Sequence, residues 1–150
     1  MKQWCLAVVL SVLASWAWAD NGLSVENAWV RMVPPVSANS AAYFTLHNMG
    51  KTAAELVGVE GDVAKAIELH TVIQEGDMMR MQPLKKLDVP AGDCVLFKPG
   101  SNHVMLIGLK QPLTEGQQVP MTLRFSNGES LTFELTVKND AGDDHAHHQH

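Results

Sequence analysis

Two histidines and two methionines in this 150-residue chain combine a spacing and a chemistry that suit a soft metal ion. His103 and Met105 stand two residues apart in the apolar run "HVMLIGL", so in a β-strand they face the same way. His70 lies in "AIELHTV" and Met81 in "DMMRMQ", on either side of a predicted turn. The full spacing is His-x10-Met-x21-His-x-Met.

These side chains are selective donors. Thioether sulfur is soft and neutral, and imidazole suits copper, zinc, iron and nickel, so the set favours copper(I), one ion per domain. Zinc prefers cysteine, histidine or carboxylate ligands, and calcium and magnesium prefer oxygen. Thioethers also survive an oxidising compartment better than paired thiolates do.

Each residue also has an ordinary structural interpretation. Met105 on a sheet face is commonly a core residue. His70 and His103 could be surface or hydrogen-bonded histidines. Met81, with Met78 and Met79 beside it, could form an adaptable apolar surface for a partner. Spacing alone does not show that the strands converge.

Short strands separated by turn signals must position these residues. We predict strands near 24–31, 41–47 and 66–72, in "AELVGVEGD", "DMMRMQPL", "DCVLFKPG" and "HVMLIGL", and at 119–125 and 131–137. The last two alternate apolar and polar residues around Asn127-Gly128, which predicts a hairpin with a type I′ turn and makes Met121 a core residue. Eight or nine strands at this density indicate an all-β antiparallel sandwich or barrel.

Within the strand near 66–72, Ile67 and Leu69 share one face, while Glu68, His70 and Val72 share the other. The turn at 74–77 makes this strand and the one carrying Met81 antiparallel neighbours.

The N-terminus resembles a secretory signal. An apolar stretch follows Lys2, and Ala17-Trp18-Ala19 has the small-x-small pattern of a cleavage site. Cleavage after Ala19 would remove residues 1–19 and leave a domain at 20–138 and a tail at 139–150. Because Lys2 is the only charged residue lost, the formal charge changes from −5 to −6. We therefore expect no nucleic-acid partner, and no membrane attachment once the signal is cleaved.

Cysteine usage excludes a disulfide within the mature chain. Cys5 leaves with the signal, so Cys94 has no partner. We favour Cys94 as a small buried apolar residue. The alternative is that Cys94 binds a metal ion as a thiolate.

The same spacing resembles the signature of the periplasmic copper-A chaperone family, the PCu(A)C copper chaperones. The segments "ENAWVR", "AAYFTLHNMG", "LDVPAG" and "KPGSNHVMLIGL" also fit that family's pattern, over about residues 24–137. The extra methionine Met78 is a mild departure that leaves the ligand spacing intact.

The resemblance implies a cupredoxin-like β-sandwich, or Greek-key barrel, with His70, Met81, His103 and Met105 as the copper(I) ligands. It also implies a periplasmic, monomeric metallochaperone. Such a protein delivers copper by ligand exchange, commonly to the copper A centre of cytochrome c oxidase. The acceptor would be cytochrome c oxidase subunit II or a thiol-based assembly factor.

The tail "NDAGDDHAHHQH" has no apolar pattern and is predicted to be disordered. Its histidines suggest metal binding, and nitrogen and oxygen donors suit copper(II). We expect the tail to capture copper(II) and the core to hold reduced copper; zinc or nickel binding by the tail is the alternative. The tail histidines are His145, His147, His148 and His150.

Two other classes of function compete. An electron-transfer cupredoxin would need a cysteine thiolate with two histidines and an axial methionine, which casts Cys94 as a ligand. An enzyme would need a nucleophile, phosphate-loop or paired-carboxylate frame, and no such motif is recognisable. We therefore do not expect an enzyme.

Overall fold

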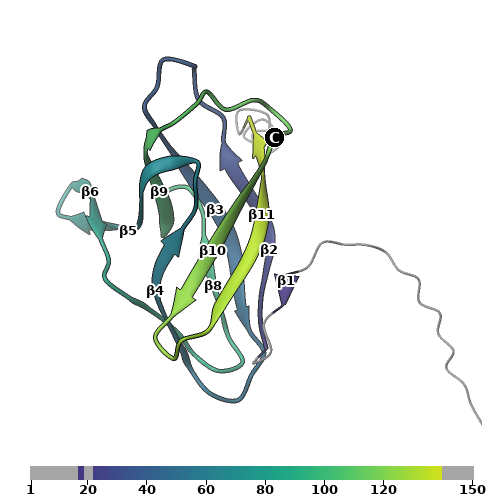
Figure 1. Cartoon of the computed structure of the whole chain (residues 1–150). Helices are drawn as coiled ribbons and strands as arrows, with labels where there is room; N and C mark the ends of the chain where they lie inside the picture. Colours follow the sequence, from purple (N-terminus) through teal and green to yellow (C-terminus); the bar gives the residue numbers. More distant parts are fainter. Residues whose placement is uncertain (1–16, 19–21, 140–150) are drawn as a thin grey trace, which may run out of the picture.

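A computed structural model describes residues 17–18 and 22–139, and every regular element within these ranges is a β-strand (Figure 1). The strands are β1 (Ala17–Trp18), β2 (Leu23–Arg31), β3 (Asn39–Asn48), β4 (Ala54–Glu60), β5 (Ala64–Glu75), β6 (Met78–Pro83), β7 (Leu87–Val89), β8 (Cys94–Phe97), β9 (His103–Leu109), β10 (Gln118–Phe125) and β11 (Ser130–Lys138). The expected all-β class is confirmed.

The strands form one continuous path in the order β6-β5-β9-β3-β2-β11-β10-β4-β7, with β1 paired to β2 and β8 paired to β3. Every pairing is antiparallel except that of β11 with β2, which is parallel. Two of the eleven strands were not predicted. β1 lies within the predicted signal, and β7 has only three residues, too few for a clear alternation.

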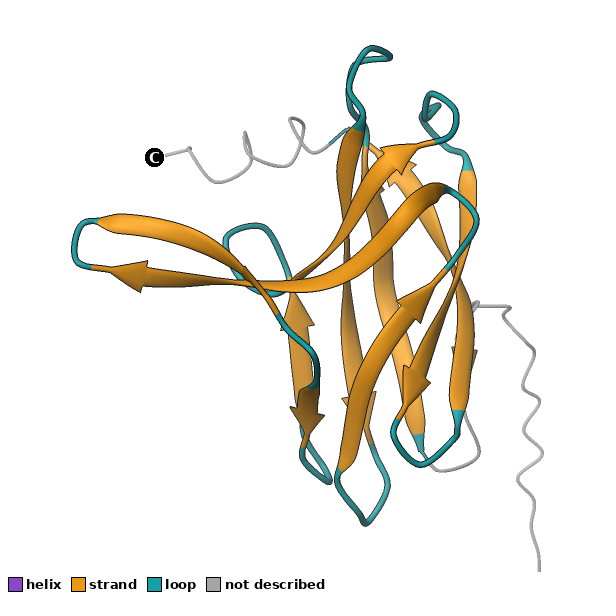
Figure 2. Ribbon diagram, turned by 60° about the vertical axis from the view of Figure 1, so that its left-hand side comes forward, coloured by secondary structure: helices purple, strands orange, loops and turns teal. Residues whose placement is uncertain are grey.

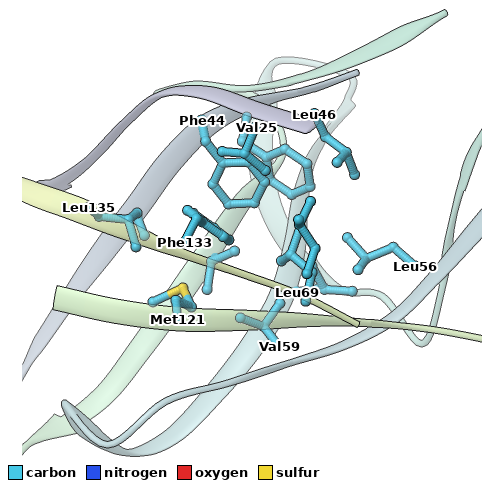
Figure 3. Close-up of a cluster of buried hydrophobic side chains, with 14 of the residues drawn as sticks. Val25, Phe44, Leu46, Leu56, Val59, Leu69, Met121, Phe133 and Leu135 are labelled. Carbon is cyan, nitrogen blue, oxygen red and sulfur yellow. The ribbon is translucent and has the colours of Figure 1, made fainter. Parts of the chain in front are cut away.

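The inner faces of the strands enclose one apolar core. Figure 3 shows side chains of β2, β3, β4, β5, β10 and β11 converging on it, among them Phe44, Leu69 and Phe133. The ring of Phe44 stacks on Phe97, with centroids 4.3 Å apart, and meets Phe133 edge-on. Met121 is buried within this core, as its alternating phase predicts.

The hairpin between β10 and β11 forms as predicted, but its turn type differs from the prediction. Gly128 alone of the Asn-Gly pair has a positive φ, 93°. The Gly128 amide donates to the Phe125 carbonyl over 3.0 Å, and the Phe125 amide donates to the Glu129 carbonyl over 2.9 Å. This is a longer loop, in which a type I turn is followed by a left-handed glycine. Asn127 does not have a positive φ, and its Oδ1 accepts a hydrogen bond from the Glu129 amide, 2.9 Å away.

The hairpin of β5 and β6 extends away from the body of the sandwich (Figure 2). β5 continues to Glu75, past the predicted end near 72, and β6 is exposed along its whole length. We call the outer part of this hairpin, residues 70–83, the arm.

Most of the predicted signal and tail lie outside the described residues. Ala17 and Trp18 form β1 and pair with Val25 and Ser24 of β2. The described part of the chain has no helix long and apolar enough to cross a membrane.

The core predicts a clear contrast between two methionines. Replacing buried Met121 with alanine should lower the free energy of unfolding by about 2–5 kcal/mol, because the change removes packed atoms and leaves a cavity. Met78→Ala, at a side chain 71% exposed, should change it by less than about 0.5 kcal/mol. Equilibrium urea unfolding of both variants measures this, and equal losses would show that Met121 does not lie in the core.

Candidate metal centre

Strand register brings the four predicted ligands to one face of the sheet. His70 lies directly opposite His103 in the β5–β9 ladder, and Glu68 lies opposite Met105. Met81 lies opposite Val72 in the β5–β6 ladder. Directly opposed residues share a face, and so do residues two apart on one strand. His70, Met81, His103 and Met105 therefore all project from the same side.

That side faces away from the core. Leu69 of β5 and Val104 and Leu106 of β9 occupy the alternate positions, and all three are buried in the core. The predicted division of β5 into an apolar face and a His70 face is confirmed. Met105 is therefore not a core residue, although it is only partly exposed.

A cavity of about 450 Å³ lies over this face. Three of the four predicted residues line it, and the ring of the fourth, His70, lies beside His103 with centroids 5.6 Å apart and planes 40° apart. The lining side chains are mainly apolar or sulfur-bearing. They come from Arg31, Val33, Asn39, Ser40, Ala41, Tyr43, Val72, Met79, Met81, Pro99, Gly100, His103 and Met105.

Each histidine is oriented by a hydrogen bond from one ring nitrogen. His103 Nδ1 lies 3.0 Å from the Ser101 carbonyl oxygen, which can only accept, so this nitrogen carries the proton. His70 Nε2 lies 2.9 Å from Glu68 Oε1 and donates to that carboxylate. In the neutral rings, the remaining nitrogens, His103 Nε2 and His70 Nδ1, then present lone pairs.

Those two lone-pair nitrogens are buried, and among the described residues neither has a hydrogen-bond partner. Native structures leave few such atoms, because an unpartnered buried polar group is costly. A metal ion held about 2 Å from each imidazole nitrogen would satisfy both atoms. The carboxylate and carbonyl behind the rings are the partners that commonly fix a ligating histidine.

Exposure differs sharply across the four residues. His103 is only 4% exposed, whereas Met81 on the arm is 56% exposed. The site therefore has a closed histidine side and an open thioether side. The donor set is soft and neutral, and it can bind a monovalent soft cation at the protein surface.

Sequence reasoning missed the aromatic wall of the cavity. Tyr43 of β3 packs on Trp29 of β2 with ring centroids 4.8 Å apart, and the Arg31 guanidinium lies 5.3 Å from the Tyr43 centroid. Lys138 stands over Trp29 at 5.8 Å. The alternation of Trp29 and Arg31 around buried Val30 could have indicated this second face.

The structure corrects the interpretation of Cys94, which is exposed rather than buried. In the short strand β8, Phe97 faces the core and Val95 packs against it, so Cys94 and Leu96 face outward. Cys94 pairs with His47 of β3, whereas Met105 pairs with Ala41 of the same strand. Six residues of strand separate these positions by about 20 Å. Cys94 therefore cannot join His103 and Met105 as a thiolate ligand, which argues against an electron-transfer copper site.

Comparison with known proteins places the chain in a family. Residues 23–137 match the profile of a family described as "Putative lipoprotein LpqE-like". The chain belongs to this family, and its cupredoxin-like fold is that of the PCuAC copper chaperone domains.

One protein sequence and two solved structures illustrate this similarity. The chain is 35% identical over 123 residues to "Putative lipoprotein Lxx21020" of Leifsonia xyli, covering 81% of this chain and 73% of that protein. It is similar to the solution structure of CuI-DR1885 from Deinococcus radiodurans, with 36% identity, a TM-score of 0.63, and 75% and 76% of the two chains covered. The copper-bound PCuAC domain of PmoF2 shares the fold at a TM-score of 0.69 and 20% identity, with 82% and 97% covered.

The hydrogen bonds predict opposite tautomers for the two histidines. In the metal-free protein with both imidazoles neutral, His103 should carry its proton on Nδ1 and His70 on Nε2. Two-bond ¹H–¹⁵N spectra distinguish the tautomers, and His70→Ala and His103→Ala assign the signals. Finding His103 protonated on Nε2 would contradict the orientation described above.

Proposed function

We propose that this protein binds one copper(I) ion through His70, Met81, His103 and Met105 and passes it on by ligand exchange. The observation that carries the proposal is a pair of buried imidazole nitrogens that have no hydrogen-bond partner within residues 17–18 and 22–139. They lie beside a cavity lined by the thioethers of Met79, Met81 and Met105. The copper-bound states named for the PmoF2 domain and for DR1885 support copper as the cargo.

Neutral ligands explain the preference for the monovalent ion. Two imidazoles and two thioethers leave the complex with a single positive charge, and thioether sulfur favours copper(I) over harder ions. Ligand exchange breaks no bond within a substrate, so this function requires no nucleophile or general base.

The open side of the site determines how copper leaves. Because Met81 is exposed while His103 is buried, an acceptor's ligands approach from the arm as Met81 releases the ion. We infer that the acceptor is the copper A centre of cytochrome c oxidase subunit II or a thiol-based assembly factor, with the chaperone acting as a monomer.

Export fits the same function. The signal-like N-terminus and a relative named as a lipoprotein both support an exported protein. We place it in the periplasm, where methionine and histidine ligands persist better than paired thiolates.

The ligand assignment predicts the behaviour of a double variant. Met81→Leu with Met105→Leu should keep the fold, because leucine has similar volume, and should abolish tight copper(I) binding. Anaerobic competition against bicinchoninate measures the affinity, and X-ray absorption counts sulfur and nitrogen neighbours. Met49→Leu with Met78→Leu is the matched control at two exposed methionines and should bind as the unmodified protein does. Stoichiometric tight binding by the first variant would refute the assignment.

The tail predicts a separate copper(II) capacity, at His145, His147, His148 and His150. A chain ending at Asn139 should still bind one copper(I) but should lose the additional copper(II) that the full chain binds. Anaerobic and aerobic titrations followed by metal analysis measure the two capacities. Equal copper(II) binding by both chains would show that the tail holds none.

A further inference from the structure

Met79 is a second thioether of the arm that borders the same cavity as the proposed ligands. It lies two residues from Met81 on β6 and opposite Gln74 of β5, so it shares the face of Met81. Its side chain is 62% exposed and lines the cavity together with Met81, His103 and Met105. Along β6, Met79 lies two residues closer to the turn at the tip of the arm than Met81 does.

We propose that Met79 is the transfer ligand of the site, the thioether that takes copper(I) from outside and hands it back. This inference rests on the proposed function. It assigns to Met79 a role in the rate of exchange and leaves the stability of the bound state to the other four residues.

The distance along the strand permits such a relay. Residues two apart on a strand are separated by about 7 Å, and each methionine has three rotatable bonds and a soft sulfur. The two sulfur atoms can therefore reach a common ion between them. Met79 and Met81 are both exposed, at 62% and 56%, whereas His103 at the inner end of the site is only 4% exposed.

The proposed step replaces one copper ligand with another. A bond forms between copper(I) and the sulfur of Met79 as the bond to the sulfur of Met81 breaks, and loading follows the reverse order. Copper remains monovalent throughout, and no proton moves because a thioether carries none. A ligand that stabilises only the transition state of this exchange speeds loading and release by the same factor and leaves the affinity unchanged.

The neighbouring Met78 provides a matched control. It stands on the same strand and is 71% exposed, but it lies opposite Glu75, on the other face of the arm, and does not border the cavity. Met78→Leu and Met79→Leu therefore make the same chemical change at two exposed edge positions that differ in the face they occupy.

The test compares both variants with the unmodified full-length chain. The equilibrium affinity for copper(I) is measured anaerobically against bicinchoninate, and the rates of loading and release are measured by stopped-flow with the same chelator over a range of concentrations. Met79→Leu should slow both rates by about tenfold, the factor produced by ~1.4 kcal/mol in the barrier, with affinity within about twofold. Met78→Leu should change neither.

Three results would overturn the proposal: unchanged rates in Met79→Leu, an equal slowing in Met78→Leu, or a large loss of affinity in Met79→Leu, which would make Met79 a resident ligand. Failure of the proposed function is separate, because the unmodified chain would then bind no stoichiometric copper(I). Thermal unfolding of both variants verifies that the fold is intact.

Discussion

The two antiparallel ladders that join β5 to β9 and β5 to β6 determine where every donor atom points. His70 opposes His103 in one ladder, and Val72 opposes Met81 in the other. Because side chains alternate along a strand, a shift of one residue in either ladder would send a donor to the opposite face. In the β5–β9 ladder the buried residues Leu69 and Val104 oppose that shift, since it would expose one of them to solvent. The same strand register therefore places the apolar residues in the core and the proposed ligands on the opposite face of the sheet.

The two ends of the site differ in their place in the sheet and in their exposure to solvent. His70, His103 and Met105 belong to strands inside the sheet path, and backbone or carboxylate groups of the protein orient both rings. Met81 belongs to the terminal strand on the arm and is exposed. In the proposed function, the hydrogen-bonded histidines retain the ion with little rearrangement, and the exposed thioether of Met81 is the ligand that leaves first. This asymmetry is what a protein needs if it must both retain and release a metal ion.

Alternation within a strand and turn signals between strands predicted much of this arrangement, because both can be read from residues close together in the sequence. Alternation assigned the faces of β5, β10 and β11, and the turn after Gln74 correctly made the strands of His70 and Met81 neighbours. The adjacency of β5 and β9 could not be derived from alternation, because it depends on long-range pairing, and it was expected only through the family resemblance. The Ser101 carbonyl was missed because a backbone acceptor has no sequence signature. Cys94 was assigned wrongly because a general preference for burial says nothing about which face of a short strand a residue occupies.

The position of β6 at the end of the sheet path has a further consequence. A terminal strand with exposed apolar side chains is a template on which another polypeptide can add a strand, and proteins commonly blunt such edges with charge. Here Arg80 stands between Met79 and Met81 and forms an ion pair with Glu75 over 3.0 Å. Each additional exposed methionine on this edge would favour association with another chain. The tendency to aggregate therefore limits how many thioether ligands the arm can carry.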